Sequence, residues 1–189
     1  MVAFFKSSLL LIFLLCACTL PVQSTLDPTV VPEATPIQAT DTPSQESDST
    51  NCAFVWARSP LPELSKEFDM ALKDSLPRAS GSADAYGENC VNGQGEVVRF
   101  LAMETDYYVT LQVDSLEDHG ELGNLIEQAL NVLDQFPVKE TPGPQPGYVG
   151  ITFEASGGLV LLWFTRLDAQ AAMDNGLRGE DLYLALREN

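Results

Sequence analysis

The alternation of hydrophobic and polar residues is clearest in the middle of the chain. Between residues 105 and 113, Tyr107, Val109 and Leu111 share one side of an extended chain, and more polar residues occupy the other. A period of two is typical of a β-strand that buries one face. The pattern predicts a strand over residues 96–113, with a bend at the polar residues 104–106.

Two longer segments repeat hydrophobic residues every three or four positions, as a helix with one buried face does. The first spans residues 61–76 and has prolines at its start. The second spans residues 115–136, where Ser115 and Asp118 resemble a capping box. A shorter helix is predicted over residues 179–188. The residues expected to face the core are Leu64, Phe68, Ala71, Leu72, Leu76, Leu122, Leu125, Ile126, Ala129, Leu130, Leu133, Phe136, Leu182, Ala185 and Leu186.

Four further strands complete the predicted fold. Residues 80–89 contain glycines and are expected to form a weak edge strand. The others are expected over residues 53–58, 148–155 and 159–166, the last two joined by a tight turn at residues 157–158. The order β-α-β-β-α-β-β-α predicts an α+β domain with a mostly antiparallel sheet and helices on one face.

The segment 159–164 is apolar on both sides, whereas a strand with one buried face should alternate. A fully buried central strand is favoured, because monomeric proteins seldom expose large apolar patches. The alternative is an open apolar patch around Trp163 that binds a partner. Tyr108 and Tyr148 would join this patch if their strands are neighbours.

The N-terminal segment has the features of an export signal. A single lysine precedes an apolar run over residues 7–15, which is shorter than the roughly 20 residues that span a membrane. Residues 15–18 read Leu-Cys-Ala-Cys and resemble the lipobox of bacterial lipoprotein precursors. Leu15 and Ala17 occupy the lipobox positions relative to Cys18, which favours Cys18 over Cys16 as the lipidated residue.

This resemblance covers residues 1–18 only. It implies a signal peptide over residues 1–17, a diacylglycerol and a fatty acid attached to Cys18, and a lipid-anchored domain on the extracytoplasmic side of the cell membrane. The alternative is an ordinary cleaved signal peptide or an uncleaved anchor.

Composition divides the rest of the chain into a tether and a domain. Residues 19–51 are rich in Pro, Thr and Ser and contain no aromatic residue, lysine or arginine, so a disordered tether is expected after Cys18. Residues 52–189 suit a single domain. This part has 9 lysines and arginines against 22 aspartates and glutamates, a net charge of −13. Such a balance argues against a nucleic-acid partner.

The number of cysteines in the domain is consistent with an exported protein. Cys52 and Cys90 remain after processing, and an even pair in an exported domain is most simply a disulfide. Because no Cys-x-x-Cys spacing occurs, a structural bridge is favoured over a redox site.

Reactive residue types are few. His119 is the single histidine of the chain, and no Gly-x-Ser-x-Gly segment accompanies it, so neither a catalytic triad nor a zinc site is predicted. Carboxylates are abundant, and four of them would converge if their segments pair as a hairpin: Asp84, Glu88, Glu104 and Asp106. Paired carboxylates serve glycoside hydrolysis or hold Ca²⁺, but solvated surface groups are favoured here.

By elimination, the sequence favours a non-enzymatic lipoprotein that binds an envelope protein. We predict no catalytic residue, no metal and no cofactor besides the lipid on Cys18. The alternative is a small surface hydrolase or a Ca²⁺-binding domain that uses the carboxylates. The candidate binding residues are Asp84, Glu88, Glu104, Asp106, Tyr108, Tyr148 and Trp163.

Overall fold

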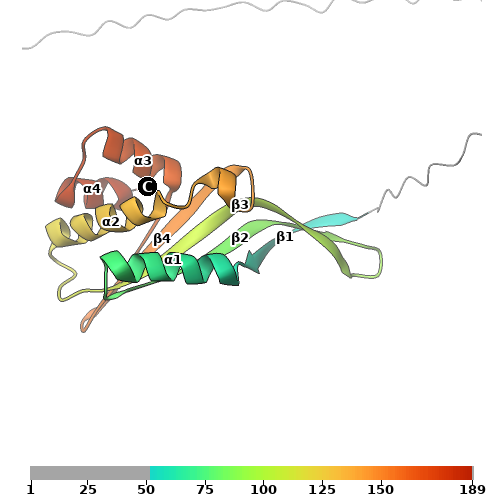
Figure 1. Cartoon of the computed structure of the whole chain (residues 1–189), viewed down its shortest axis with the longest axis horizontal. Helices are drawn as coiled ribbons and strands as arrows, with labels where there is room; N and C mark the ends of the chain where they lie inside the picture. Colours follow the sequence, from blue (N-terminus) through green and yellow to red (C-terminus); the bar gives the residue numbers. More distant parts are fainter. Residues whose placement is uncertain (1–51, 189) are drawn as a thin grey trace, which may run out of the picture. The chain divides into compact units, whose positions relative to one another are not determined.

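A five-stranded sheet with helices on one face forms the part of the chain that the computed structural model describes, residues 52–188 (Figure 1). This confirms the α+β class. The predicted signal peptide, Cys18 and the tether lie outside the described residues. The strands are β1 (Ala53–Pro60), β2 (Ala79–Val91), β3 (Val97–Gln112), β4 (Gln145–Ala155) and β5 (Gly158–Thr165). The helices are α1 (Pro62–Ser75), α2 (His119–Leu133), α3 (Arg166–Asp174) and α4 (Gly179–Arg187), with a 3₁₀ turn η1 (Val138–Glu140).

The strands lie in the sheet in the order in which they occur in the chain. β3 and β4 are parallel, whereas the other neighbouring strands are antiparallel. The prediction of a mostly antiparallel sheet is therefore wrong, and the sheet is mixed. The physical reason is that α2 follows β3 and carries the chain back to the end of the sheet where β3 begins. β4 therefore runs in the same direction as β3.

β2 lies between β1 and β3, so the prediction of an edge strand over residues 80–89 is also wrong. Its glycines instead permit close packing. A Cβ atom on Gly81 would lie 2.5 Å from Leu72 and 2.8 Å from Phe68, both on α1. The absence of a side chain at residue 81 lets α1 pack directly on the sheet.

The predicted helices are present with shifted ends. α2 begins at His119 and not at Ser115, because Asp118 is the capping residue and accepts a hydrogen bond from the Glu121 N–H at 3.0 Å. The Ser115 hydroxyl accepts from the Glu117 N–H instead, so the predicted capping box does not form. α3 was not predicted. Its buried residues, Ala169 and Ala172, are too small to give a clear hydrophobic period.

One hydrophobic core lies between the helices and the sheet. It contains the predicted alternating residues of β3 and most of the predicted helix stripes; Leu64, Ala71, Leu125 and Phe136 are half-buried at its margin, and Ala185 is half-buried outside it. The largest side chains that it buries fully are Phe68, Leu72, Tyr107, Leu122, Ile126, Ile151, Phe153, Leu162, Phe164, Leu182, Tyr183 and Leu186. The predicted disulfide between Cys52 and Cys90 is present and joins the start of β1 to the end of β2.

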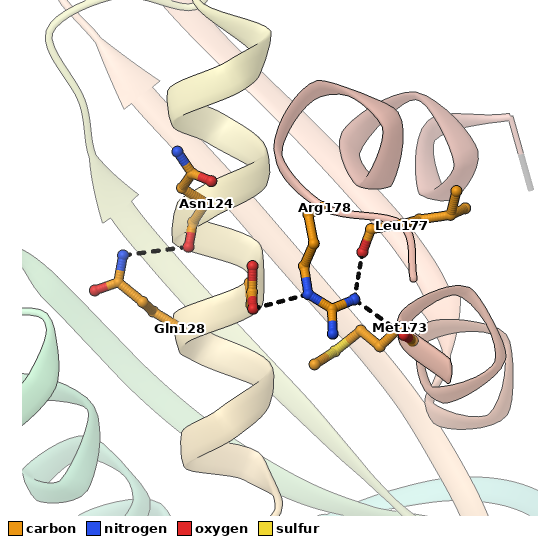
Figure 2. Close-up of polar contacts among 6 residues, drawn as sticks. Asn124, Gln128, Met173, Leu177 and Arg178 are labelled. Carbon is orange, nitrogen blue, oxygen red and sulfur yellow. Dashed lines mark hydrogen bonds and ion pairs between the residues drawn. The ribbon is translucent and has the colours of Figure 1, made fainter. Parts of the chain in front are cut away.

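Arg178 holds the C-terminal helices against α2 (Figure 2). Its guanidinium donates hydrogen bonds to the carbonyl oxygens of Met173 and Leu177, at the end of α3 and just after it. The same group forms an ion pair with Glu127 of α2 at 3.0 Å. One side chain thus connects the end of α3, the start of α4 and the middle of α2.

No helix within residues 52–188 has the length and apolar character that crossing a membrane requires.

Candidate functional site

The face of the sheet opposite the helices is uncovered, and the apolar side chains of β5 lie on it. Leu159, Leu161 and Trp163 are 63%, 60% and 36% exposed, whereas Leu162 and Phe164 point to the helices and are buried. The favoured prediction for this segment, a buried central strand, is wrong because β5 is the edge of the sheet. An exposed apolar patch, the alternative, is what the structure contains.

Every strand contributes an aromatic side chain to this open face, and β1 also carries Phe54, which is 50% exposed and lies two residues from Trp56. Five of these residues are linked by ring contacts or through Arg58, and we call them the aromatic platform: Trp56 on β1, Tyr86 on β2, Tyr108 on β3, Tyr148 on β4 and Trp163 on β5. The rings of Trp56 and Tyr86 are stacked with centroids 5.3 Å apart. Trp163 is stacked on Tyr148 at 5.5 Å and lies 5.6 Å from Tyr108.

The three candidate aromatic residues therefore do come together. The register explains how, because Tyr108, Gly150 and Trp163 stand opposite one another on β3, β4 and β5. A Cβ atom at residue 150 would lie 2.6 Å from the Trp163 ring. Glycine at this position lets the indole lie across β4 and contact Tyr148 on β4 and Tyr108 on β3.

Arg58 lies at the centre of the platform. Its guanidinium carbon is 5.7 Å from the ring centroids of both Tyr86 and Tyr108, and 6.0 Å from that of Trp163. The guanidinium also donates to the Tyr108 hydroxyl and lies 3.8 Å from the Asp106 carboxylate. Cation–π contacts and the ion pair together fix the positive charge among the rings.

Asp106 is the charged residue most deeply buried beneath this face, at 2% exposure. The ladder between β3 and β4 shifts register here, and the Asp106 carboxylate accepts a hydrogen bond from the Tyr148 N–H at 2.9 Å. Burial raises the pKa of Asp106 and the nearby Asp84 carboxylate adds to this, although the Tyr148 N–H and Arg58 act in the opposite direction. The carboxylate thus completes the backbone hydrogen bonding of the irregular strand.

The predicted hairpin of the carboxylate segments is present, and it brings some of the four carboxylates together. Asp84 stands directly opposite Asp106, and Glu104 lies two residues from Asp106 on β3. Burial, followed by the charge of Asp106, raises the pKa of Glu104. Glu88 is farther along β2, opposite Leu101. Within residues 52–188, no group of three or more His, Cys, Asp or Glu side chains is arranged to hold a metal ion.

Sequence reasoning missed Trp56, Arg58 and Tyr86. A signal for Tyr86 was present, because it alternates with Asp84 and Glu88 and so shares their face of the strand. Nothing in the sequence pattern placed Arg58 among aromatic rings.

His119 lies apart from the platform, at the start of α2. Its ring is stacked on that of Tyr183 at 4.7 Å, and Nδ1 is 3.8 Å from the Glu180 carboxylate. These contacts join α2 to α4, which is a structural role.

Comparison with known proteins yields no relative. No protein-family model matches the chain, no curated protein matches it, and no solved structure matches it.

Proposed function

We propose that this protein is a non-enzymatic binding module, anchored by a lipid on Cys18 on the extracytoplasmic side of the cell membrane. In this proposal, the aromatic platform binds a positively charged envelope protein. The observation that carries the proposal is the uncovered sheet face, on which aromatic side chains from five strands form one group and three of them contact one arginine.

The composition of the platform supports a protein partner. Trp, Tyr and Arg are the residue types most enriched among the side chains that dominate protein–protein binding energy. Six residues of these three types form one continuous group on the open face: Trp56, Arg58, Tyr86, Tyr108, Tyr148 and Trp163. Their rings are held by one another and by Gly150, so little side-chain freedom is lost on binding.

The edge strand β5 supports the same proposal. Proteins usually protect exposed strand edges with charged residues or proline. β1, at the opposite edge, contains Arg58 and ends at Pro60, but Gly158–Thr165 has neither a charged residue nor a proline. An apolar edge without this protection is suited to pairing with another chain.

Charge determines the chemistry of the partner. The domain carries a net charge of −13, and the open face has two cations, Arg58 and Arg99, against the carboxylates of Asp84, Glu88, Glu104, Asp106 and Glu154. Such a field attracts a basic partner and repels an acidic one.

The export features of the sequence support the location. The lipobox-like residues before Cys18 and the Pro/Thr/Ser-rich tether indicate a domain held away from a membrane, and a disulfide is typical of an oxidising compartment.

The second candidate, a hydrolase or Ca²⁺ site built on the carboxylates, has less support. Asp106 is already bonded to the Tyr148 N–H and paired with Arg58, so it is poorly suited to act as a catalytic base or cation ligand. If Ca²⁺ bound the folded domain, millimolar Ca²⁺ would raise the melting temperature.

The test uses site-specific photo-cross-linking in cells. A photo-reactive amino acid at Leu161, exposed beside the platform, is compared with one at Lys66, exposed on α1. We expect a basic protein to cross-link from residue 161 and not from residue 66, and Trp163→Glu to abolish this without unfolding the domain. The purified pair should dissociate as salt concentration rises.

Other outcomes would contradict the proposal. Equal cross-linking from both positions, cross-links only to a second copy of the chain, or an acidic partner each argue against it. The anchor is tested separately: Cys18→Ser should move the protein out of the membrane fraction, and retention there would argue against lipidation at Cys18.

A further inference from the structure

A small pocket opens on the same face as the aromatic platform, at the place where β4 begins. Its lining residues come from four strands and are Trp56, Tyr86, Met103, Glu104 and Gln145. We call it the Glu104 pocket. We infer that the Glu104 pocket receives one arginine or lysine side chain of the partner, an inference that rests on the function proposed above.

The irregular sheet creates the pocket. Tyr86, Glu104 and Gln145 stand opposite one another on β2, β3 and β4. β4 starts at Gln145, so β3 has no partner strand on that side beyond Glu104. The ladder between β2 and β3 also shifts register at this point, skipping Met103. The sheet is therefore irregular beside Glu104, and the pocket lies at this irregularity.

The size of the pocket limits what it holds. Its volume is about 130 Å³. Sites for drug-sized ligands measure about 300–1,000 Å³. A single side chain fits this volume better than a cofactor or an oligosaccharide does.

The lining has the chemistry of a cation site with apolar walls. The stacked rings of Trp56 and Tyr86 form aromatic walls, and Met103 offers a polarisable apolar surface. The same chemistry is already seen beside the pocket, where the guanidinium of Arg58 lies over the Tyr86 ring. Arginine and lysine both pair an apolar stem with a charged end, so they match such a lining.

Glu104 provides the negative charge. Among the described residues, none forms a hydrogen bond or an ion pair with its carboxylate, and the nearby Arg58 is paired with Asp106. Burial and the charge of Asp106 raise the pKa of Glu104, which means that the ionised carboxylate is disfavoured where it lies. A cation in the pocket would compensate this charge.

The experiment follows Trp56 by ¹⁹F NMR in the full-length lipidated protein in detergent. The chain has two tryptophans, so labelling with 5-fluorotryptophan gives two signals, and Trp163→Phe assigns them. The probes are acetyl-Ala-Arg-Ala-amide and acetyl-Ala-Lys-Ala-amide. The matched neutral probe replaces arginine with citrulline, and choline chloride tests a quaternary ammonium group.

We expect both cationic peptides to shift the Trp56 signal saturably, and the citrulline peptide to leave it unchanged. Glu104→Gln should weaken the cationic peptides at least tenfold. Glu154→Gln removes the same charge from the same face at a distance from the pocket, opposite Gln112, and should change their affinity less than twofold. Melting temperatures establish that both variants are folded.

Several results would overturn the inference: an equal response to the citrulline peptide, an equal loss of affinity in Glu154→Gln, or a choline response as large as that to the arginine peptide. The last would indicate a quaternary ammonium ligand such as a lipid headgroup. If the peptides leave Trp56 unchanged while cross-links from residue 161 persist, the inference is wrong and the proposed function is unaffected. If those cross-links are absent, the proposed function fails and the inferred partner fails with it.

Discussion

The indole of Trp163 lies so close to the backbone of Gly150 that a methyl group at residue 150 would come within 2.6 Å of the ring. This contact lets a side chain on the edge strand extend over β4. Trp163 stacks on Tyr148 and lies beside Tyr108 as a result. A glycine in the middle of a strand usually weakens it, and here the missing side chain gives the platform its shape.

Gly150→Ala should displace the indole of Trp163 and destabilise the fold. Inserting a methyl group into packed surroundings costs about 1–3 kcal/mol in the free energy of unfolding. The measurements are urea unfolding and iodide quenching of tryptophan fluorescence, which should increase. Gly93→Ala is the matched control, since a Cβ there has no neighbour within 4 Å. Unchanged quenching in Gly150→Ala would mean that Trp163 is not held by this contact.

We expect the hydrogen bond that Asp106 accepts to contribute more to the stability of the fold than its charge does. Asp106→Ala leaves the Tyr148 N–H without its acceptor, which costs about 1–3 kcal/mol for a buried group. Asp106→Asn keeps an oxygen in place, and it should lose less stability. Urea unfolding and hydrogen exchange at the Tyr148 amide measure both effects.

The control for Asp106 is Asp84→Ala, which removes the carboxylate directly opposite on β2. Because the Asp84 charge raises the pKa of Asp106, its removal should leave stability unchanged or slightly higher. A loss in Asp84→Ala as large as that in Asp106→Ala would argue against the acceptor role.

The raised pKa values of Glu104 and Asp106 predict a pH dependence of stability. A folded chain whose carboxyl pKa is raised keeps its proton where the unfolded chain has lost it. The stabilising contribution is therefore present below the ordinary pKa values of 3.8 for Asp and 4.5 for Glu, and it is lost as pH rises through the raised values.

The measurement is urea unfolding between pH 3 and pH 7 of the wild type and of the double variant Glu104→Gln/Asp106→Asn. Relative to the variant, the wild type should lose stability as pH rises through this range. If the difference in stability between the two proteins does not change with pH, or changes in the opposite direction, the raised pKa values of Glu104 and Asp106 are contradicted.

Hydrophobic periodicity predicted which faces of the elements are buried. The alternation around Tyr107 and Val109 and the helical stripe around Ile126 are all in the core. Periodicity does not identify which strands are neighbours, because a strand has the same pattern beside any partner. For this reason the parallel pairing of β3 with β4 and the position of β5 at the edge were not predicted.

The candidate site was predictable to a similar extent. Tyr108, Tyr148 and Trp163 were expected to gather if their strands were neighbours, and they do. The favoured prediction for β5 was wrong because it relied on the rarity of exposed apolar strands. Arg58 was missed because an isolated cation on a short strand carries no periodic signal, and its place among the rings depends on the register of β1 with β2.

The disulfide between Cys52 and Cys90 makes stability depend on the redox state. The two residues are 38 positions apart, and closing a loop of this length stabilises the folded state by about 3–4 kcal/mol, mainly by restricting the unfolded chain. Reductant should therefore lower the melting temperature of the wild type markedly. The double variant Cys52→Ala/Cys90→Ala should melt near the reduced wild type and should not respond to reductant. Thiol titration of the native domain should detect no free thiol from these residues, and two free thiols without reductant would contradict the bridge.

Since the bridge fixes the start of β1 beside β2, its loss should also loosen the stacking of Trp56 on Tyr86 at one end of the platform.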